Sequence, residues 1–123
     1  MKNKILYALG VISMIAILGG CSKVSDEDLR AAHIAADNGA LIIDVRTREE
    51  FNAGHVQNAV NLPVQLLERY YEQIPQDKAI VVYCRTGSRS QMAAEFLGKK
   101  GWKVYDVATQ EEWERKLPAI SEK

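Results

Sequence analysis

The sequence predicts an α/β domain built around a mostly parallel sheet. Segments with helical apolar spacing alternate along the chain with short apolar runs of the strand type, and this alternation is typical of parallel sheets. The run at 79–83 is the plainest strand, because its β-branched and aromatic residues suit a buried sheet position. With 123 residues in all, the chain has room for one such domain and not for two.

Two helix starts are visible in the first half of the chain. Ser25 precedes three acidic residues and then apolar residues at helical spacing, which end at Asn38-Gly39. Thr47 and Glu50 repeat the capping-box pattern, and Gly54 ends the short helix that they open. The elements expected here are, in order, a helix that follows Ser25 and stops at Asn38-Gly39, a strand at 41–44, a short helix opened by Thr47 and ended by Gly54, and a brief strand at 60–62.

The second half shows the same alternation, with clear stop signals. Pro75 and Pro118 each follow a helical pattern, and Gly101 is the stop for the helix that begins at about Ser90. The elements expected here are, in order, a helix at 64–74, a strand at 79–83, a helix at 91–100, a strand at 102–107 and a helix at 110–117. In such sheets the working groups lie beyond the carboxyl ends of the strands, and Cys84 stands at such a place.

Cys84 lies at a strand-to-helix turn, and this position favours an anion. Backbone N–H groups in the turn and the positive end of the following helix both stabilise negative charge, so a thiolate is favoured there. Arg85 and Arg89 add two positive charges to the loop. The sequence therefore predicts Cys84 as the nucleophile. The residues expected to bind substrate around it are Arg85, Thr86, Gly87, Ser88, Arg89 and Ser90.

The loop C-R-T-G-S-R resembles the active-site loop of rhodanese-like sulfurtransferases. Asp-Val-Arg at 44–46, Glu50-Phe51 and Gly-His-Val at 54–56 follow in the family's order, and the resemblance covers roughly residues 26 to 117. It implies a three-layer α/β/α domain, assigned to 26–120, in which Cys84 carries a transferable sulfur as a persulfide. It further implies a small anionic donor such as thiosulfate, a thiol or cyanide as acceptor, and neither cofactor nor metal.

Two other functions stay open at this point. Phosphatases and arsenate reductases of the same fold resemble this site but carry C-x5-R, whereas Cys84 to Arg89 is C-x4-R. The shorter loop suits an outer sulfur atom better than a tetrahedral oxyanion, which favours sulfur transfer. A carrier that accepts one sulfur on Cys84 without turning over is the second alternative.

Four residues outside the loop are expected to support it structurally: Asp44, Arg46, Glu50 and His55. Polar groups that leave a buried strand usually brace neighbouring loops, and Arg46 is expected to pair with Glu50. The resemblance places His55 in a structural turn rather than in catalysis. The chain departs from the family in the stretch 108–113, Ala-Thr-Gln-Glu-Glu-Trp, where many rhodaneses carry a Gly-Gly pair a few residues before a tryptophan. This departure bears on pocket shape and substrate.

The N-terminus is expected to be a targeting segment. Lys2 and Lys4 precede an apolar run of about 15 residues, shorter than the ~20 that span a bilayer. Leu18-Gly19-Gly20-Cys21 resembles a bacterial lipobox. We therefore expect a signal peptide at 1–20, lipidation at Cys21 and a tether at 21–25, with an uncleaved membrane anchor as the alternative. The protein would then be anchored in the cell envelope. In a Gram-negative organism it would face the periplasm, and Ser22 favours the outer membrane; in a Gram-positive organism the same signal means the outer face of the plasma membrane.

Charge and cysteine content limit the classes of binding partner that we expect. The chain has 16 basic and 16 acidic side chains, so its composition gives no reason to expect nucleic acid. Once Cys21 is lipidated, Cys84 is the last thiol of the mature chain, and no internal disulfide is possible. The expected partners are therefore the donor, the acceptor and the membrane, and the protein is expected to be a monomer.

Overall fold

Four parallel strands form the centre of the domain. The computed structural model describes residues 24–120. The strands are β1 (Leu41–Asp44), β2 (Val60–Asn61), β3 (Ile80–Cys84) and β4 (Val104–Thr109). They are arranged in the order β2-β1-β3-β4, and every neighbouring pair is parallel. The prediction of an α/β domain with a parallel sheet is confirmed.

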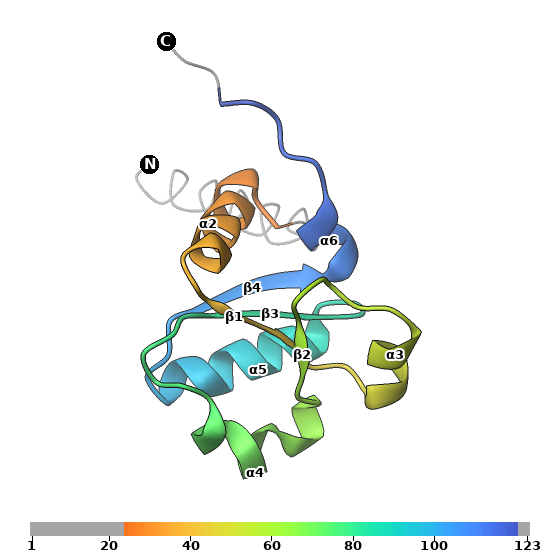
Figure 1. The fold of residues 1–123 in the computed structure, drawn as a ribbon, viewed down its shortest axis with the longest axis vertical. Coiled ribbons are helices and arrows are strands. Elements are labelled where there is room, and N and C mark those ends of the chain that lie inside the picture. The colour runs from red at the N-terminus through yellow and green to blue at the C-terminus, as the bar shows by residue number, and fades with distance from the viewer. Residues whose placement is uncertain (1–23, 121–123) are drawn as a thin grey trace, which may run out of the picture.

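Helices cover both faces of this sheet, as the three-layer prediction requires (Figure 1). One face carries α2 (Asp26–Asp37) and α6 (Gln110–Glu114), and the other carries α4 (Leu67–Tyr70) and α5 (Ser88–Lys99). The short helix α3 (Arg48–Ala53) lies near the carboxyl ends of the strands. That end of the sheet is therefore lined by α3 and by the start of α5.

The central strand β3 separates two apolar clusters. Ile80, Val82 and Cys84 face the cluster that includes α5 residues, whereas Val81 and Tyr83 face the cluster that includes α2 residues. This alternation follows from the two-residue period of a strand. All five residues are buried, so β3 is fixed on both faces. The position of Cys84 at the carboxyl end of β3 is therefore fixed.

The predicted helix caps are present at both early helices. The Ser25 hydroxyl accepts a hydrogen bond from the Asp28 amide at 3.0 Å. Thr47 and Glu50 form the complete capping box, with the Glu50 amide 3.1 Å from the Thr47 hydroxyl oxygen and the Thr47 amide 3.0 Å from Glu50 Oε1. These bonds satisfy amides that the helix itself leaves unpaired.

Several element boundaries differ from the sequence prediction. The stretch expected as one helix at 64–74 is divided into a turn of 3-10 helix η1 (Val64–Leu66), α4, and a second such turn η2 (Tyr71–Gln73). Only Leu67 and Ile74 are fully buried there, so no continuous apolar stripe holds one helix. Helix α5 starts at Ser88, earlier than expected, while β4 runs on to Thr109 and α6 ends at Glu114.

Two expectations concern residues beyond this domain. The proposed signal peptide at 1–20 and the lipidation site Cys21 lie outside the described residues, which begin at Val24. Among residues 24–120, no helix has the length and apolarity needed to cross a membrane.

Candidate active site

The sulfur of Cys84 is held by two backbone amides. Sγ accepts hydrogen bonds from the Gly87 amide at 3.0 Å and from the Ser90 amide at 3.3 Å. Both donors belong to the turn and first residues of α5, a helix of 12 residues whose N-terminal end carries partial positive charge. Cys84 itself is 1% exposed. Backbone N–H donors placed in this way favour negative charge on the atom that accepts from them.

Gly87 allows this loop to close on the sulfur. Its φ is +103°, in the left-handed region that favours glycine, and it caps the start of α5. A Cβ on Gly87 would also lie 3.4 Å from the Cβ of Ala108 on the neighbouring strand. The glycine therefore serves both the turn and the close approach of β4.

The strand beside Cys84 contains a bulge that the sequence did not predict. Val82 pairs with Asp106 but Cys84 pairs with Thr109, so β4 has one extra residue here. Ala108 lies in this bulge at φ +65°, and its amide donates to Asp106 Oδ1 at 2.9 Å. The only signal in the sequence was the absence of the family's two glycines at this place.

Glu50 and Arg89 join α3 to the start of α5. Arg89 Nη1 donates to Glu50 Oε1 at 2.7 Å and Nη2 donates to Oε2 at 3.1 Å. The Arg89 bonds and the Thr47 amide lower the pKa of Glu50 from 4.5 to about 2. The same pair raises the pKa of Arg89. Arg85 makes a longer contact with the same carboxylate, with Nη1 4.0 Å from Glu50 Oε2, and its side chain is 71% exposed.

The expected ion pair between Arg46 and Glu50 is wrong, because Arg46 pairs with Asp44. Arg46 Nη2 lies 2.6 Å from Asp44 Oδ2, and Nε donates to both carboxylate oxygens at 2.9 and 3.0 Å. Arg46 also donates to the Gly54 carbonyl at 2.7 Å. A fully buried carboxylate needs such a partner, whereas Glu50 is partly exposed and reaches Arg89 instead. The bracing role predicted for Asp44 and Arg46 agrees with these contacts.

Tyr83 completes this buried group, and sequence reasoning missed it. Its hydroxyl donates to Asp44 Oδ2 at 2.7 Å and accepts a bond from the Val56 amide at 3.0 Å. Burial, with smaller contributions from Asp44, raises the pKa of Tyr83, so the hydroxyl stays protonated. Because Tyr83 immediately precedes Cys84, the group fixes the end of β3. A lone tyrosine in an otherwise aliphatic run was the available signal.

His55 lies in the predicted turn and contacts α3 rather than the sulfur. Its ring stacks on Phe51 with centroids 3.7 Å apart, and Nδ1 is 2.8 Å from the Phe51 carbonyl oxygen. The side chain is exposed. These contacts are structural, which is the role that the resemblance implied.

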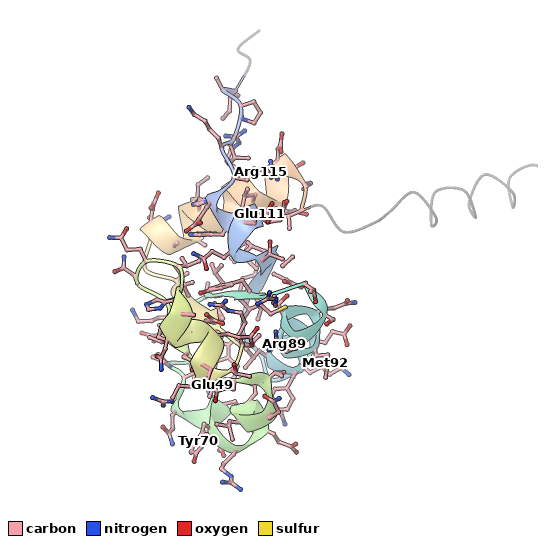
Figure 2. All side chains as sticks on the ribbon, turned by 90° about the vertical axis from the view of Figure 1, so that its right-hand side faces the viewer. Glu49, Tyr70, Arg89, Met92, Glu111 and Arg115 are labelled. Atoms are coloured by element: carbon pink, nitrogen blue, oxygen red, sulfur yellow. The ribbon has the colours of Figure 1, made fainter. Side chains whose placement is uncertain are left out.

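Two cavities flank the loop that follows Cys84. One, of about 440 Å³, is lined by Val24, Thr86, Gly87, Ser88, Gln91, Asp106 and Ala108. The other, of about 410 Å³, is lined by Arg46, Glu49, Glu50, Ala53, Gly54, Arg85 and Gln110. Figure 2 looks onto this end of the molecule, with Arg89 near the middle of the view. Within residues 24–120, His, Cys, Asp and Glu side chains form no group of three that could hold a metal ion.

Comparison with known sequences supports the resemblance. Residues 26–115 match the family described as Rhodanese-like domain. A protein of Allochromatium vinosum named sulfurtransferase is 32% identical over 77 residues, which cover 63% of this chain and 72% of that protein. The thiosulfate sulfurtransferase GlpE of Coxiella burnetii is 32% identical over 80 residues, covering 64% of this chain and 75% of its own length. These relatives support a sulfurtransferase-type function.

Solved structures agree with this result. A rhodanese-related protein of Thermoplasma volcanium gives a TM-score of 0.62 at 29% identity, over 80% of this chain and 96% of that chain. A rhodanese from E. coli, solved with anions, gives 0.56 at 28% identity, over 63% of this chain and 95% of its own. By sequence and by fold, the chain belongs to the rhodanese-like domain family.

Proposed function

We propose that the protein transfers sulfane sulfur from thiosulfate, or a similar donor, to a thiophilic acceptor through a persulfide on Cys84. The observation that carries this proposal is the pair of amide hydrogen bonds, from Gly87 and Ser90, to the Cys84 sulfur. They stabilise an anionic sulfur without requiring a general base. The C-x4-R loop and the relatives named as sulfurtransferases also support it.

The first step forms the persulfide. The Cys84 thiolate attacks the outer sulfur of thiosulfate, a bond forms between the two sulfur atoms, and the S–S bond of thiosulfate breaks. Sulfite leaves with the bonding electron pair. The negative charge is then on the outer sulfur of Cys84–S–S⁻, and the loop amides are the groups nearest to stabilise it.

The second step returns the enzyme to its starting state. A thiolate or cyanide attacks the outer sulfur, forms a new bond to it and breaks its bond to Cys84. The product is a new persulfide or thiocyanate, and the electron pair returns to the Cys84 thiolate. Neither step needs an oxidant or a reductant. In each step the bonding electron pair of the broken S–S bond stays with the leaving group, so the sulfur atom is transferred without a change in its oxidation level.

The two loop arginines differ in what they can do for the donor. Glu50 engages both terminal nitrogens of Arg89, whereas Arg85 is 71% exposed and 4.0 Å from the same carboxylate. Arg85 therefore has the guanidinium that can most readily reach an incoming anion. Donor binding by Arg89 stays a prediction, and its hydrogen bonds support a role in holding the loop.

The decisive experiment follows turnover and the mass of Cys84 together. The protein and its Cys84→Ser variant are incubated with thiosulfate and cyanide, and thiocyanate is measured alongside a mass gain of one sulfur atom. We expect both signals in the protein and neither in the variant, whose fold is checked by circular dichroism. Turnover retained by Cys84→Ser would exclude the mechanism.

The same assay separates the two alternatives. A sulfur carrier would show the mass gain with little thiocyanate, whereas a phosphatase or arsenate reductase would show neither. In that last case p-nitrophenyl phosphate and arsenate are the next substrates. The one-residue difference between C-x4-R and C-x5-R is what makes them the less favoured class.

We further propose that the protein is a lipoprotein of the cell envelope, lipidated at Cys21 after removal of residues 1–20. The basic start, the short apolar run and Leu18-Gly19-Gly20-Cys21 support this. Several acyl chains would anchor the domain where one would be marginal. Mass spectrometry of the N-terminal peptide tests it, and an unmodified Cys21 in membranes would contradict it.

A further inference from the structure

The described chain begins beside the active-site loop. Val24 lines the same cavity as Thr86, Gly87 and Ser88, the residues that follow Cys84 in the turn. In Figure 1 the start of α2 lies next to α6 and the carboxyl end of β4. The chain therefore enters the domain at the end of the sheet that carries the reactive sulfur.

Arg115 holds the chain at this entry point. Its Nη2 donates to the Val24 carbonyl at 2.7 Å, and its Nη1 donates to Asp26 Oδ1 at 2.6 Å. The third nitrogen, Nε, donates to Glu112 at 3.2 Å, which ties the guanidinium to α6. Val24 also packs against the apolar cluster under α2. The position of Val24 is thus fixed by polar and apolar contacts.

The covalent chain limits how far Cys21 can lie from this point. Three Cα–Cα steps separate Cys21 from Val24, and they cover at most about 11 Å in any conformation. A compact domain of this size is about 30 Å across. A membrane anchor at Cys21 could therefore not reach around to the far end of the strands, where Gln76 precedes β3.

We propose, resting on the lipidation of Cys21 proposed above, that the active-site loop faces the bilayer surface and that the acceptor is a thiol carried at that surface. The cavity that Val24 lines suits this placement. Thr86, Ser88 and Gln91 are polar and uncharged, and the one carboxylate among its lining residues, Asp106, is half-buried and accepts a hydrogen bond from the Ala108 amide. Uncharged groups approach lipid headgroups without the large cost of desolvating a charge. A short tether also keeps the loop at a high local concentration of any thiol on the membrane.

Photo-crosslinking tests the placement independently of activity. Benzoylphenylalanine replaces Gln91, which lines the cavity with Val24, or Gln76, which is also exposed and lies at the opposite end of the sheet. The full-length lipidated variants are reconstituted in phosphatidylcholine vesicles and irradiated. We expect lipid adducts at position 91 and few at position 76. Equal adducts at both positions, or none at 91, would overturn the proposal.

A longer tether provides the matched variant. Insertion of 24 Gly/Ser residues between Lys23 and Val24 adds a root-mean-square reach of about 27 Å, whereas the same insertion after Ile120 leaves the tether unchanged. Turnover of thiosulfate is compared with phosphatidylthioethanol in the vesicles and with dithiothreitol in solution. We expect the tether insertion to lower the rate with the lipid thiol at least about fivefold and to leave the dithiothreitol rate unchanged. An unchanged lipid-thiol rate would overturn the proposal.

The same experiments distinguish a failure of this inference from a failure of the two proposals on which it rests, sulfur transfer and lipidation of Cys21. Failure to turn over dithiothreitol would count against sulfur transfer, while the crosslinks would still report the placement. Absence of acyl chains on Cys21 would remove the lipid anchor, and the membrane-facing placement would be wrong with it.

Discussion

Glu50 accepts hydrogen bonds from both terminal nitrogens of Arg89, at 2.7 and 3.1 Å. Arg89 lies in the first turn of α5, next to Ser90, whose amide holds the Cys84 sulfur. The same carboxylate accepts the Thr47 amide bond that caps α3. One side chain therefore fixes α3 relative to the loop that follows Cys84, and with it the start of α5, whose amides donate to the Cys84 sulfur.

Replacing Glu50 with Gln tests this link through its pH dependence. The pKa of Glu50 is lowered to about 2 in the folded state, so its carboxylate stabilises the fold above the unfolded value of 4.5. That stabilisation is lost as the pH falls from about 4.5 toward 2. We expect Glu50→Gln to cost about 1–2 kcal/mol at pH 7 and the two proteins to converge near pH 2. Urea unfolding from pH 7 to pH 2 measures both, and parallel curves would contradict the assignment.

Arg85 is expected to attract the donor more than Arg89 does. Arg85→Ala should raise the KM for thiosulfate about fivefold, equivalent to about 1 kcal/mol, and leave kcat within twofold. Arg89→Ala should instead lower the free energy of unfolding, because it leaves Glu50 without its main partner. Arg48→Ala is the control, since Arg48 is exposed on α3 and lines neither cavity beside the loop. Steady-state kinetics at low salt measure these changes. An unchanged KM for thiosulfate in Arg85→Ala would show that Arg85 does not attract the donor.

Local signals were sufficient for the fold and for the place of Cys84 at the end of a strand. Capping residues at Ser25 and Thr47 marked two helices, and the apolar run before Cys84 marked the central strand. Each of these signals depends on neighbours in the chain, which the sequence displays directly. The position of Cys84 at the end of a strand followed from the alternation of elements.

Contacts between segments distant in the sequence could not be predicted from it. Glu50 is near Arg46 in sequence, but Arg46 is taken by the buried carboxylate of Asp44, and Arg89 arrives from α5. Burial decides this choice, and it depends on the packing of the whole sheet. The bulge at Ala108 is likewise a property of the pairing between β3 and β4. The sequence showed only that the family's two glycines are absent from this part of the chain.

Ala108 is expected to be a strained position whose relief stabilises the domain. Its φ of +65° is unfavourable for a residue with a Cβ. Ala108→Gly should raise the free energy of unfolding by about 1 kcal/mol, whereas Ala35→Gly, inside α2, should lower it by about 1 kcal/mol. Loss of the Cβ beside Gly87 should also favour bulkier acceptor thiols over cyanide. Urea unfolding and acceptor kinetics test both effects, and a destabilised Ala108→Gly would show that the bulge is not strained.

Tyr83→Phe tests whether the buried group under β3 holds the nucleophile in place. The substitution leaves the Val56 amide without its partner and removes one donor from the buried carboxylate of Asp44. Because neither group can reach water, we expect a loss of about 2–3 kcal/mol in the free energy of unfolding. Tyr105→Phe is the matched control, since the Tyr105 hydroxyl forms no hydrogen bond to other residues of the described chain, and its loss should stay below about 0.5 kcal/mol. Turnover of the folded Tyr83→Phe protein should fall through kcat with little change in the KM for thiosulfate, because the altered group orients Cys84 and does not contact the donor. Equal stability losses in the two variants would mean that the Tyr83 hydroxyl does not fix the end of the strand.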